Sequence, residues 1–328
     1  MTTELTIQSL LPAIKKPKEV IQSNAKTFVG IDFGTSTSVV SIAMLDPVKT
    51  IEIQTVWIDQ LNSDGIGKMS SEKIPTVVAW HRDRLLIGKG AADLKYFKRR
   101  GIDVWYSFKM KLGEALGPKY CNSLVKSIRR PSDATRVFFQ YLKDEIERFV
   151  KAHKMPQTIE YAVSIPASFE ANQRKDLLEA LKAVGINMGS QSLIDEPNAA
   201  FLSYVVETNT DRSMEKLLVP PDYPLHILVF DFGAGTCDIS ILEVGHDING
   251  LYSKNLSISR FEKLGGDDID RLIARKILFD QLLEENNAKE DDFRTPQVNR
   301  CIIPKLMKPA EELKIQICQA VALQHKLG

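Results

Sequence analysis

Two segments of the sequence carry the same motif, an aspartate in an apolar run followed by a turn of glycine and hydroxyl residues. The first copy spans Ile31 to Thr37 and the second spans Phe230 to Thr236. Such a turn has few bulky Cβ groups, so backbone N–H groups can converge on phosphate oxygens while hydroxyl groups add further donors. The motif therefore predicts two hairpins whose tips bind phosphate.

Phosphate would be bound by the residues of the two turns, which are Gly34, Thr35, Ser36, Thr37, Gly233, Ala234, Gly235 and Thr236. Asp32 and Asp231 would repel phosphate, and they make sense if a hydrated Mg²⁺ lies between them and a polyphosphate. The alternative is that each motif is only a hairpin turn. Two matched copies favour a duplicated lobe with one nucleotide held between the halves.

Strands alternate with helices along the chain, which predicts an α/β class. Helices are expected at about 91–100, 134–153 and 170–184 and from Pro197, and strands at 28–31, 39–45, 51–57, 74–80, 85–88, 161–165, 193–194 and 227–230. The expected domains are a disordered leader (1–26), a first lobe (27–225) with an inserted subdomain at about 63–132, and a partial second lobe (226–328).

Composition excludes several classes of function. The 328 residues are 44% apolar and carry 43 Lys+Arg against 42 Asp+Glu, a balance that argues against a nucleic-acid binder. We interpret the basic stretch from Lys95 to Lys111 as a solvated helix face. No apolar run reaches the ~18 residues of a membrane span, and no signal peptide is recognisable. The cysteine spacing supports neither a zinc site nor a disulfide framework, so a cytoplasmic setting is the default.

Other phosphate-binding motifs fail on inspection. A P-loop ending at Gly67-Lys68 would need a glycine at position 62, which is Asn62. A dinucleotide fingerprint beginning at Gly88-Lys89-Gly90 would need its third glycine at position 93, which is Asp93.

From about Phe28 to its C-terminus the chain resembles the nucleotide-binding domain of the heat-shock protein 70 chaperones, within the actin and sugar-kinase superfamily. Besides the two hairpins, four segments carry the resemblance: Ser164 to Phe169, Asn172-Gln173-Arg174, Ile194 to Ala200 and Leu264 to Asp270. The resemblance implies an actin-like ATPase fold (ribonuclease H-like) with duplicated lobes, the second one incomplete.

The resemblance also implies roles for single residues. Asp32 and Asp231 would hold the waters of Mg²⁺, and Thr35 and Thr236 would contact the transferred phosphoryl group. Lys109 matches the family's catalytic lysine, which orients the attacking water, although an ordinary surface cation is the alternative. Glu196 would complete the positioning of that water; its alternative is a first-turn carboxylate that favours the helix dipole. The predicted catalytic residues are thus Lys109, Glu196, Asp231 and Thr236.

On the nucleoside side, Gly265 and Gly266 belong to a family segment near the nucleotide, and Glu311 and Lys314 would contact the ribose. This chain departs from the family where Ile315 replaces the arginine that packs on adenine and where Ala234 replaces a glycine of the second turn. The third, adenosine-binding glycine turn is missing, because no glycine occurs between Gly266 and Gly328.

The resulting hypothesis is an ATP-binding module that hydrolyses ATP to ADP and phosphate with Mg²⁺, coupled to protein folding. Its partners would be unfolded client proteins, a J-domain protein and a nucleotide exchange factor, and neither nucleic acid nor a membrane. A non-hydrolysing interaction protein and an actin-like filament protein are the alternatives. The Gly265-Gly266-Asp267-Asp268 element favours the chaperones over filament proteins.

Overall fold

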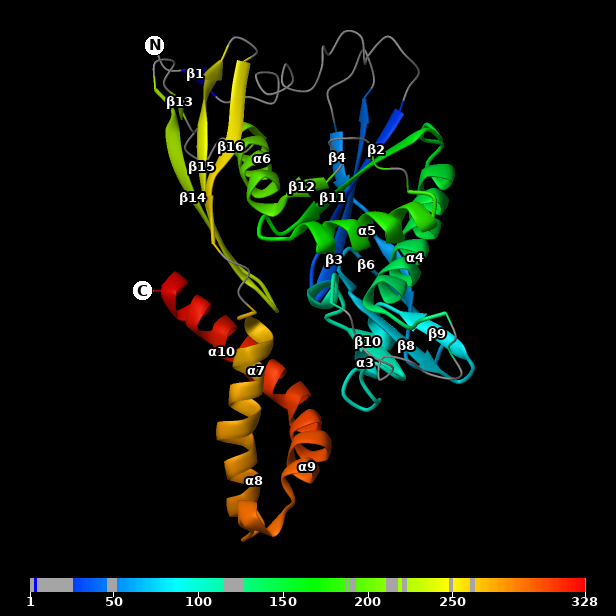
Figure 1. Cartoon of the computed structure of the whole chain (residues 1–328), viewed down its shortest axis with the longest axis vertical. Helices are drawn as coiled ribbons and strands as arrows, with labels where there is room; N and C mark the ends of the chain where they lie inside the picture. Colours follow the sequence, from blue (N-terminus) through cyan, green and yellow to red (C-terminus); the bar gives the residue numbers. More distant parts are fainter. Residues whose placement is uncertain are drawn as a thin grey trace.

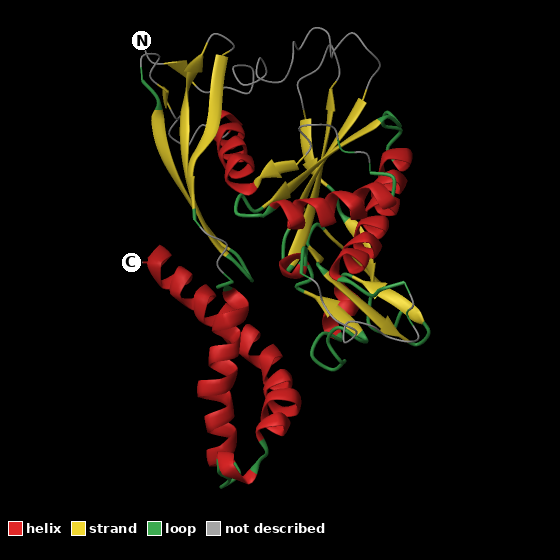
Figure 2. Cartoon of the chain, in the orientation of Figure 1, coloured by secondary structure: helices red, strands yellow, loops and turns green. Residues whose placement is uncertain are grey.

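The computed structural model describes residues 3–4, 26–45, 52–114, 125, 127–186, 188, 193–210, 218–219, 223–247, 250–259 and 263–327. Two sheets, one in each lobe, stand beside one another with helix α6 (Glu196–Thr210) between them (Figure 1). Below them lie a smaller sheet on the first-lobe side and a pair of helical arms on the second-lobe side (Figures 1 and 2).

The large sheet of the first lobe has the strand order β12-β11-β2-β3-β4. Its strands are β2 (Lys26–Phe33), β3 (Thr37–Leu45), β4 (Glu52–Thr55), β11 (Ile159–Ile165) and β12 (Leu193–Asp195), with β7 (Ile74–Pro75) also paired to β3. The first three strands are antiparallel, whereas β11 runs parallel to β2 and β12 parallel to β11. Each of these strands was expected, and the mixed order is that of a ribonuclease H-like lobe.

Helices α4 (Pro131–Ala152) and α5 (Ala171–Ala183) build the core of this lobe. Apolar residues recur every three to four positions on α4, so one face is buried, as the sequence predicts. Phe138 and Phe139 of that face pack on Phe33 of β2, with ring centroids 6.2 and 4.9 Å away. The helix begins three residues earlier than expected. Pro131 is tolerated in its first turn, and the Asp133 carboxylate accepts from the N–H groups of Arg129 and Arg130.

The segment after β4 forms a hairpin, β5 (Ile58–Leu61) and β6 (Lys68–Ser71), and then a separate sheet of order β10-β8-β9. This sheet consists of β8 (Val77–His81), β9 (Arg84–Ile87) and β10 (Val104–Tyr106). The helix predicted over 91–100 is wrong, because α3 (Lys89–Asp93) ends at Asp93 and gives way to turns. The interpretation of the basic stretch as a helix face is therefore wrong as well.

The second lobe repeats the antiparallel half of the first. Strands β14 (Leu225–Phe232), β15 (Cys237–Asp247) and β16 (Gly250–Ile258) form an antiparallel sheet. One face packs on α6 (Glu196–Thr210), where Phe201 meets Leu242 and Val244. The opposite face exposes apolar side chains at alternate positions, namely Leu228, Phe230, Phe232, Ile239 and Ile241.

The helical arms follow this sheet. The first contains α7 (Gly266–Ile273), the π-helical η4 (Ala274–Leu278) and α8 (Phe279–Glu285). The second contains α9 (Thr295–Gln297), η6 (Val298–Ile302) and α10 (Ile303–Leu327). Phe279, Val298 and Ile303 are buried between them. The predicted leader, residues 1–26, lies outside the described residues except for Lys26 and β1 (Thr3–Glu4), which pairs with β13 (Leu218–Val219).

Candidate functional site

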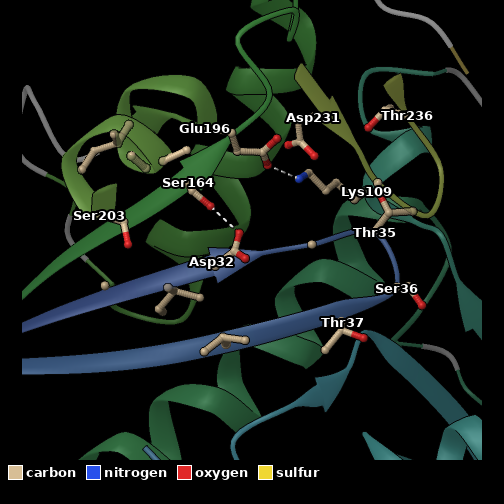
Figure 3. Close-up of a pocket in the computed structure, with 18 of the residues that line it drawn as sticks. Asp32, Thr35, Ser36, Thr37, Lys109, Ser164, Glu196, Ser203, Asp231 and Thr236 are labelled. Carbon is tan, nitrogen blue, oxygen red and sulfur yellow. Dashed lines mark hydrogen bonds and ion pairs between the residues drawn. The ribbon is translucent and has the colours of Figure 1, made fainter. Parts of the chain in front are cut away.

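The tips of the two repeated hairpins line one cavity of about 700 Å³. The hairpins have matching registers, since Phe33 pairs with Ser38 in the first and Phe232 with Cys237 in the second. Of the predicted phosphate-binding and metal-binding residues, those that line this cavity are Asp32, Gly34, Thr35, Ser36, Thr37, Asp231, Gly233, Ala234 and Thr236. Figure 3 shows Asp32 and Asp231 on different strands of the site, with Thr35 and Thr236 at the turns.

Glycine is required more strictly in the first turn than in the second. A Cβ on Gly34 would lie 2.1 Å from the carbonyl oxygen of Thr37, whereas a Cβ on Gly233 would stay 3.6 Å from the nearest atom. Ala234 is not among the non-glycine residues with positive φ. Its backbone therefore accommodates the methyl group that replaces the family's glycine.

Lys109 and Glu196 both line the cavity, and their side chains point toward each other (Figure 3). Lys109 lies in the short η2 helix (Lys109–Lys111), Glu196 is the first residue of α6, and Nζ donates to Oε1 across 2.7 Å. The side chains are only 4% and 16% exposed. The rings of Phe33 and Phe169 lie 5.6 and 5.8 Å from Nζ and flank it.

Burial is the main reason why the pKa of Glu196 lies above its ordinary value; Lys109 opposes the shift, and Asp231 and Asp32 add to it. The pKa of Asp231 is also raised, first by burial and then by the carboxylate of Asp238. The described lining of the cavity carries three carboxylates, Asp32, Glu196 and Asp231, against the single ammonium group of Lys109, and a bound cation would offset the difference.

The sequence did not predict two polar residues that lie next to these aspartates, the hydrogen-bond donor Ser164 and the carboxylate Asp238. Ser164, on β11, donates a 2.7 Å hydrogen bond to Asp32. Asp238, the residue opposite Asp231 in the second hairpin, is 4% exposed and accepts a short hydrogen bond from Ser168. Ser164 and Ser168 both lie in the family-like segment Ser164 to Phe169. Their place in that segment is the sequence feature that could have predicted hydrogen bonds to Asp32 and Asp238.

Gly265 and Gly266 lie behind the second turn rather than in the cavity lining. The N–H of Gly266 donates to the carbonyl of Gly233 across 3.0 Å, and the N–H of Asp267 donates to that of Ala234 across 2.8 Å. A Cβ on Gly265 would lie 2.5 Å from the backbone of Ala234. These two glycines therefore support the turn through close backbone contact.

The predicted ribose contacts are not brought to the cavity either. Glu311 accepts a 3.3 Å hydrogen bond from the hydroxyl of Tyr96. Lys314 forms a 2.8 Å ion pair with the buried Asp270 and donates to the carbonyl of Gly266 across 3.1 Å. Gly235 likewise does not line the cavity; a Cβ there would lie 2.8 Å from the side chain of Thr35.

The paired hairpins, the strand order of the first lobe and the repeat of its antiparallel half define an actin-like ATPase fold. A family profile described as "Hsp70 protein" matches residues 125–327. The chain therefore belongs to the Hsp70 family.

Individual relatives agree with this assignment. "Chaperone protein dnaK3" of Thermosynechococcus vestitus is 30% identical over 307 residues, which cover 88% of this chain and 39% of the relative. "Chaperone protein DnaK" is 27% identical in Nitrosopumilus maritimus and 28% in Mycoplasma mobile, again over 88% of this chain and over 38% and 40% of those proteins. The chain thus spans about two fifths of the length of the relatives it matches.

None of the helices described by the structure combines the length and the apolar character needed to cross a membrane.

Proposed function

We propose that this chain binds ATP together with Mg²⁺ and hydrolyses it slowly to ADP and phosphate, as the ATPase module of a chaperone. The observation that carries the proposal is the buried Lys109–Glu196 ion pair at 2.7 Å, held in the same cavity as both aspartate-bearing hairpins. A cation and a carboxylate fixed beside two phosphate-binding turns can orient a water molecule towards a terminal phosphate.

Asp32 and Asp231 fit a hydrated Mg²⁺. Magnesium prefers oxygen ligands, retains several waters and is usually bound through one or two carboxylates plus substrate phosphates. The described residues contain no cluster of three or more His, Cys, Asp or Glu side chains that would enclose a metal ion. Burial, followed by the neighbouring carboxylate of Asp238, raises the pKa of Asp231, and a cation beside it would favour the ionised form. When bound, Mg²⁺ would neutralise part of the negative charge on the phosphates.

Each side chain of the site has its own role, which depends on where it lies in the cavity. The hydroxyl groups of Thr35 and Thr236 donate to phosphate oxygens at the two tips. Lys109 faces the terminal phosphate, and Glu196 holds Lys109 in place and accepts a hydrogen bond from the attacking water. No covalent nucleophile is needed, because phosphoryl transfer of this kind depends on positioning and electrostatic stabilisation.

Coupling to protein folding belongs to the same proposal. The relatives carry the name chaperone protein, and on that basis the partners are unfolded client proteins, a J-domain protein and a nucleotide exchange factor, in the cytoplasm.

A second candidate is an interaction protein that has lost hydrolysis. It is favoured by one observation: Glu311 and Lys314 are engaged with Tyr96 and Asp270 instead of facing the cavity. Adenosine would then gain little from these two side chains, and nucleotide affinity would come from the phosphate half of the site alone.

Thermal unfolding with and without ligand tests the proposal. ATP with Mg²⁺ should raise the melting temperature, since a ligand at 100 times its Kd stabilises the folded state by about 2.7 kcal/mol. EDTA should abolish most of the shift, and the double variant Asp32→Asn/Asp231→Asn should lose its magnesium dependence. An identical melting temperature with and without Mg-ATP would reject the ATPase and leave the interaction protein.

A further inference from the structure

A second cavity, of about 1120 Å³, lies between the small sheet of the first lobe and the helical arms of the second. One wall is the turn segment after α3 together with Tyr106 of β10. The other wall consists of Asp267 and Arg271 on α7 and of six residues further along the chain, Asn299, Cys301, Ile303, Pro304, Lys305 and Met307. Of the described residues, none lines both this cleft and the phosphate cavity. The cleft is therefore a separate place in the molecule.

Positive charge gathers on both walls of the cleft. Among the residues that the structure describes, its lining contains one carboxylate, Asp267, and six cationic side chains: Lys95, Lys98, Arg99, Arg100, Arg271 and Lys305. Within the part of the chain that the structure describes, Lys95, Lys98, Arg100 and Lys305 form no ion pair, while Arg99 is bound by Asp103 across 2.6 Å. The whole chain has a net charge of only +1. The positive potential is thus local to this cleft, as expected of an anion-binding surface.

Aromatic rings hold some of these cations in place. The guanidinium of Arg100 lies 4.2 Å from the centroid of Tyr106, and Nζ of Lys95 lies 4.9 and 5.0 Å from the rings of Tyr96 and Tyr106. Such cation–π contacts reduce the freedom of long side chains before a ligand arrives.

The cleft also offers an apolar platform beside the charges. Phe97 is 69% exposed at its edge, and Ile303, Pro304 and Met307 line the facing wall. An exposed aromatic ring next to guanidinium and ammonium groups suits a ligand that combines a planar or apolar group with phosphate.

We propose that this cleft binds a phosphorylated small molecule of nucleotide size with at least two phosphate groups. Its phosphates lie between the basic walls and its apolar group contacts Phe97 and the start of α10. The enclosed volume is close to the roughly 300–1,000 Å³ of small-molecule sites. Cations on two facing walls favour a compact multivalent anion over an extended acidic peptide, and arginine binds phosphate in a bidentate manner. Because the cations come from both lobes, the ligand links one lobe to the other.

Cys301 reports on the cleft directly. Cys301 is exposed and lines the cleft, whereas Cys318 is exposed on α10 outside it. Alkylation rates of the two thiols, followed by mass spectrometry, are measured with inorganic tripolyphosphate and with ATP as probes. At about ten times its Kd a probe leaves Cys301 accessible about one tenth of the time, so its alkylation slows about tenfold. Cys318 keeps its rate, and ATP protects at lower concentration than tripolyphosphate.

Two charge-reversal variants, one in the cleft and one on α4 as its control, test whether the basic side chains of the cleft bind the anion. Lys98→Glu/Arg100→Glu should abolish the protection of Cys301, while Arg148→Glu/Lys151→Glu on the exposed side of α4 should retain it. An unchanged circular dichroism spectrum and a cooperative thermal transition show that each variant is folded. Protection should weaken as salt rises. The proposal is overturned if millimolar tripolyphosphate and ATP leave Cys301 unprotected or if charge reversal leaves protection intact. It is equally overturned if an acidic peptide or a single-stranded oligonucleotide protects better than ATP.

Discussion

The Nζ atom of Lys109 donates a hydrogen bond to Oε1 of Glu196 across 2.7 Å, although the two residues lie in different elements far apart in the sequence. The pair is almost fully buried and belongs to the cavity lined by both phosphate turns. A buried ion pair is weak support for stability, since desolvation offsets most of its attraction. Its position beside the turns fits a role in chemistry better than a role in folding.

Replacing Lys109 by alanine should separate hydrolysis from binding. Without the ammonium group the terminal phosphate loses the cationic contact that we propose for it, so single-turnover hydrolysis should fall roughly 100-fold, the usual loss for one electrostatic contact to a transition state. The Kd for ATP should stay within about threefold, because the turns and the aspartates still bind the phosphates. Lys111→Ala, two residues away and more exposed, is the control and should hydrolyse normally. Equal losses in both variants would argue against a catalytic role for Lys109.

The raised pKa of Glu196 predicts the acid side of the pH–rate profile. The carboxylate must be ionised to hold Lys109, so hydrolysis should be lost as pH falls through a pKa above the ordinary 4.5. The folded protein holds this proton more tightly than the unfolded chain does. The free energy of unfolding should therefore fall as pH rises through the interval between the two values.

The measurement is kcat/KM across pH, together with the same profile for Glu196→Gln. In Glu196→Gln the fall of kcat/KM at acid pH should disappear, and kcat/KM should be much lower at every pH. A limb that stays unchanged in Glu196→Gln would assign it to another group, of which Asp231 is the nearest choice because its pKa is also raised.

The two glycine turns offer a matched pair of substitutions. Gly34→Ala places a Cβ 2.1 Å from the carbonyl oxygen of Thr37, so the first turn must change shape. Mg-ATP should then bind at least about tenfold more weakly, since backbone donors no longer converge. Gly233→Ala, whose Cβ meets nothing closer than 3.6 Å, should bind normally. Calorimetric titration of Mg-ATP into both variants measures the two affinities. If Gly233→Ala binds Mg-ATP more weakly than Gly34→Ala does, phosphate binds differently from our proposal.

Local patterns were sufficient for much of the fold. The paired hairpins, α4, α5 and β11 were predictable because each shows its own periodicity and its own terminal signals within a few residues. The Lys109–Glu196 pair follows neither periodicity nor spacing, and only the family resemblance brought the two residues together before the structure did.

The failures have physical reasons. Residues 94–100 were expected to continue a helix, but the cationic side chains of Lys95 and Arg100 lie over the ring of Tyr106, and Phe97 is exposed, so the segment forms no single apolar stripe. The ribose contacts of Glu311 and Lys314 stay predictions; in the structure these side chains contact Tyr96 and Asp270. The rotation of α10 is fixed by the burial of Ile303 and Ala310 against the other arm, a tertiary effect that a helix pattern alone does not reveal.

Removal of Lys314 should destabilise the second lobe, because its 2.8 Å ion-pair partner Asp270 is buried. Asp270 is 2% exposed at its side chain, so Lys314→Met leaves a buried carboxylate without its partner. The free energy of unfolding should drop by about 3 kcal/mol at neutral pH, as for other broken buried pairs. The loss should shrink at acid pH, because the pKa of Asp270, raised by burial, rises further without the lysine and the neutral acid tolerates burial.

Chemical denaturation measures this change, and two further variants make it specific. Lys308→Met removes an exposed lysine of the same helix, whose partner Glu312 lies 3.9 Å away, and should cost less than about 0.5 kcal/mol. Lys314→Met/Asp270→Asn should recover part of the lost stability, because no buried charge then remains unpaired. A double variant as unstable as Lys314→Met would mean that Lys314 acts through its hydrogen bond to Gly266, and thus through support of the second phosphate turn, rather than through Asp270.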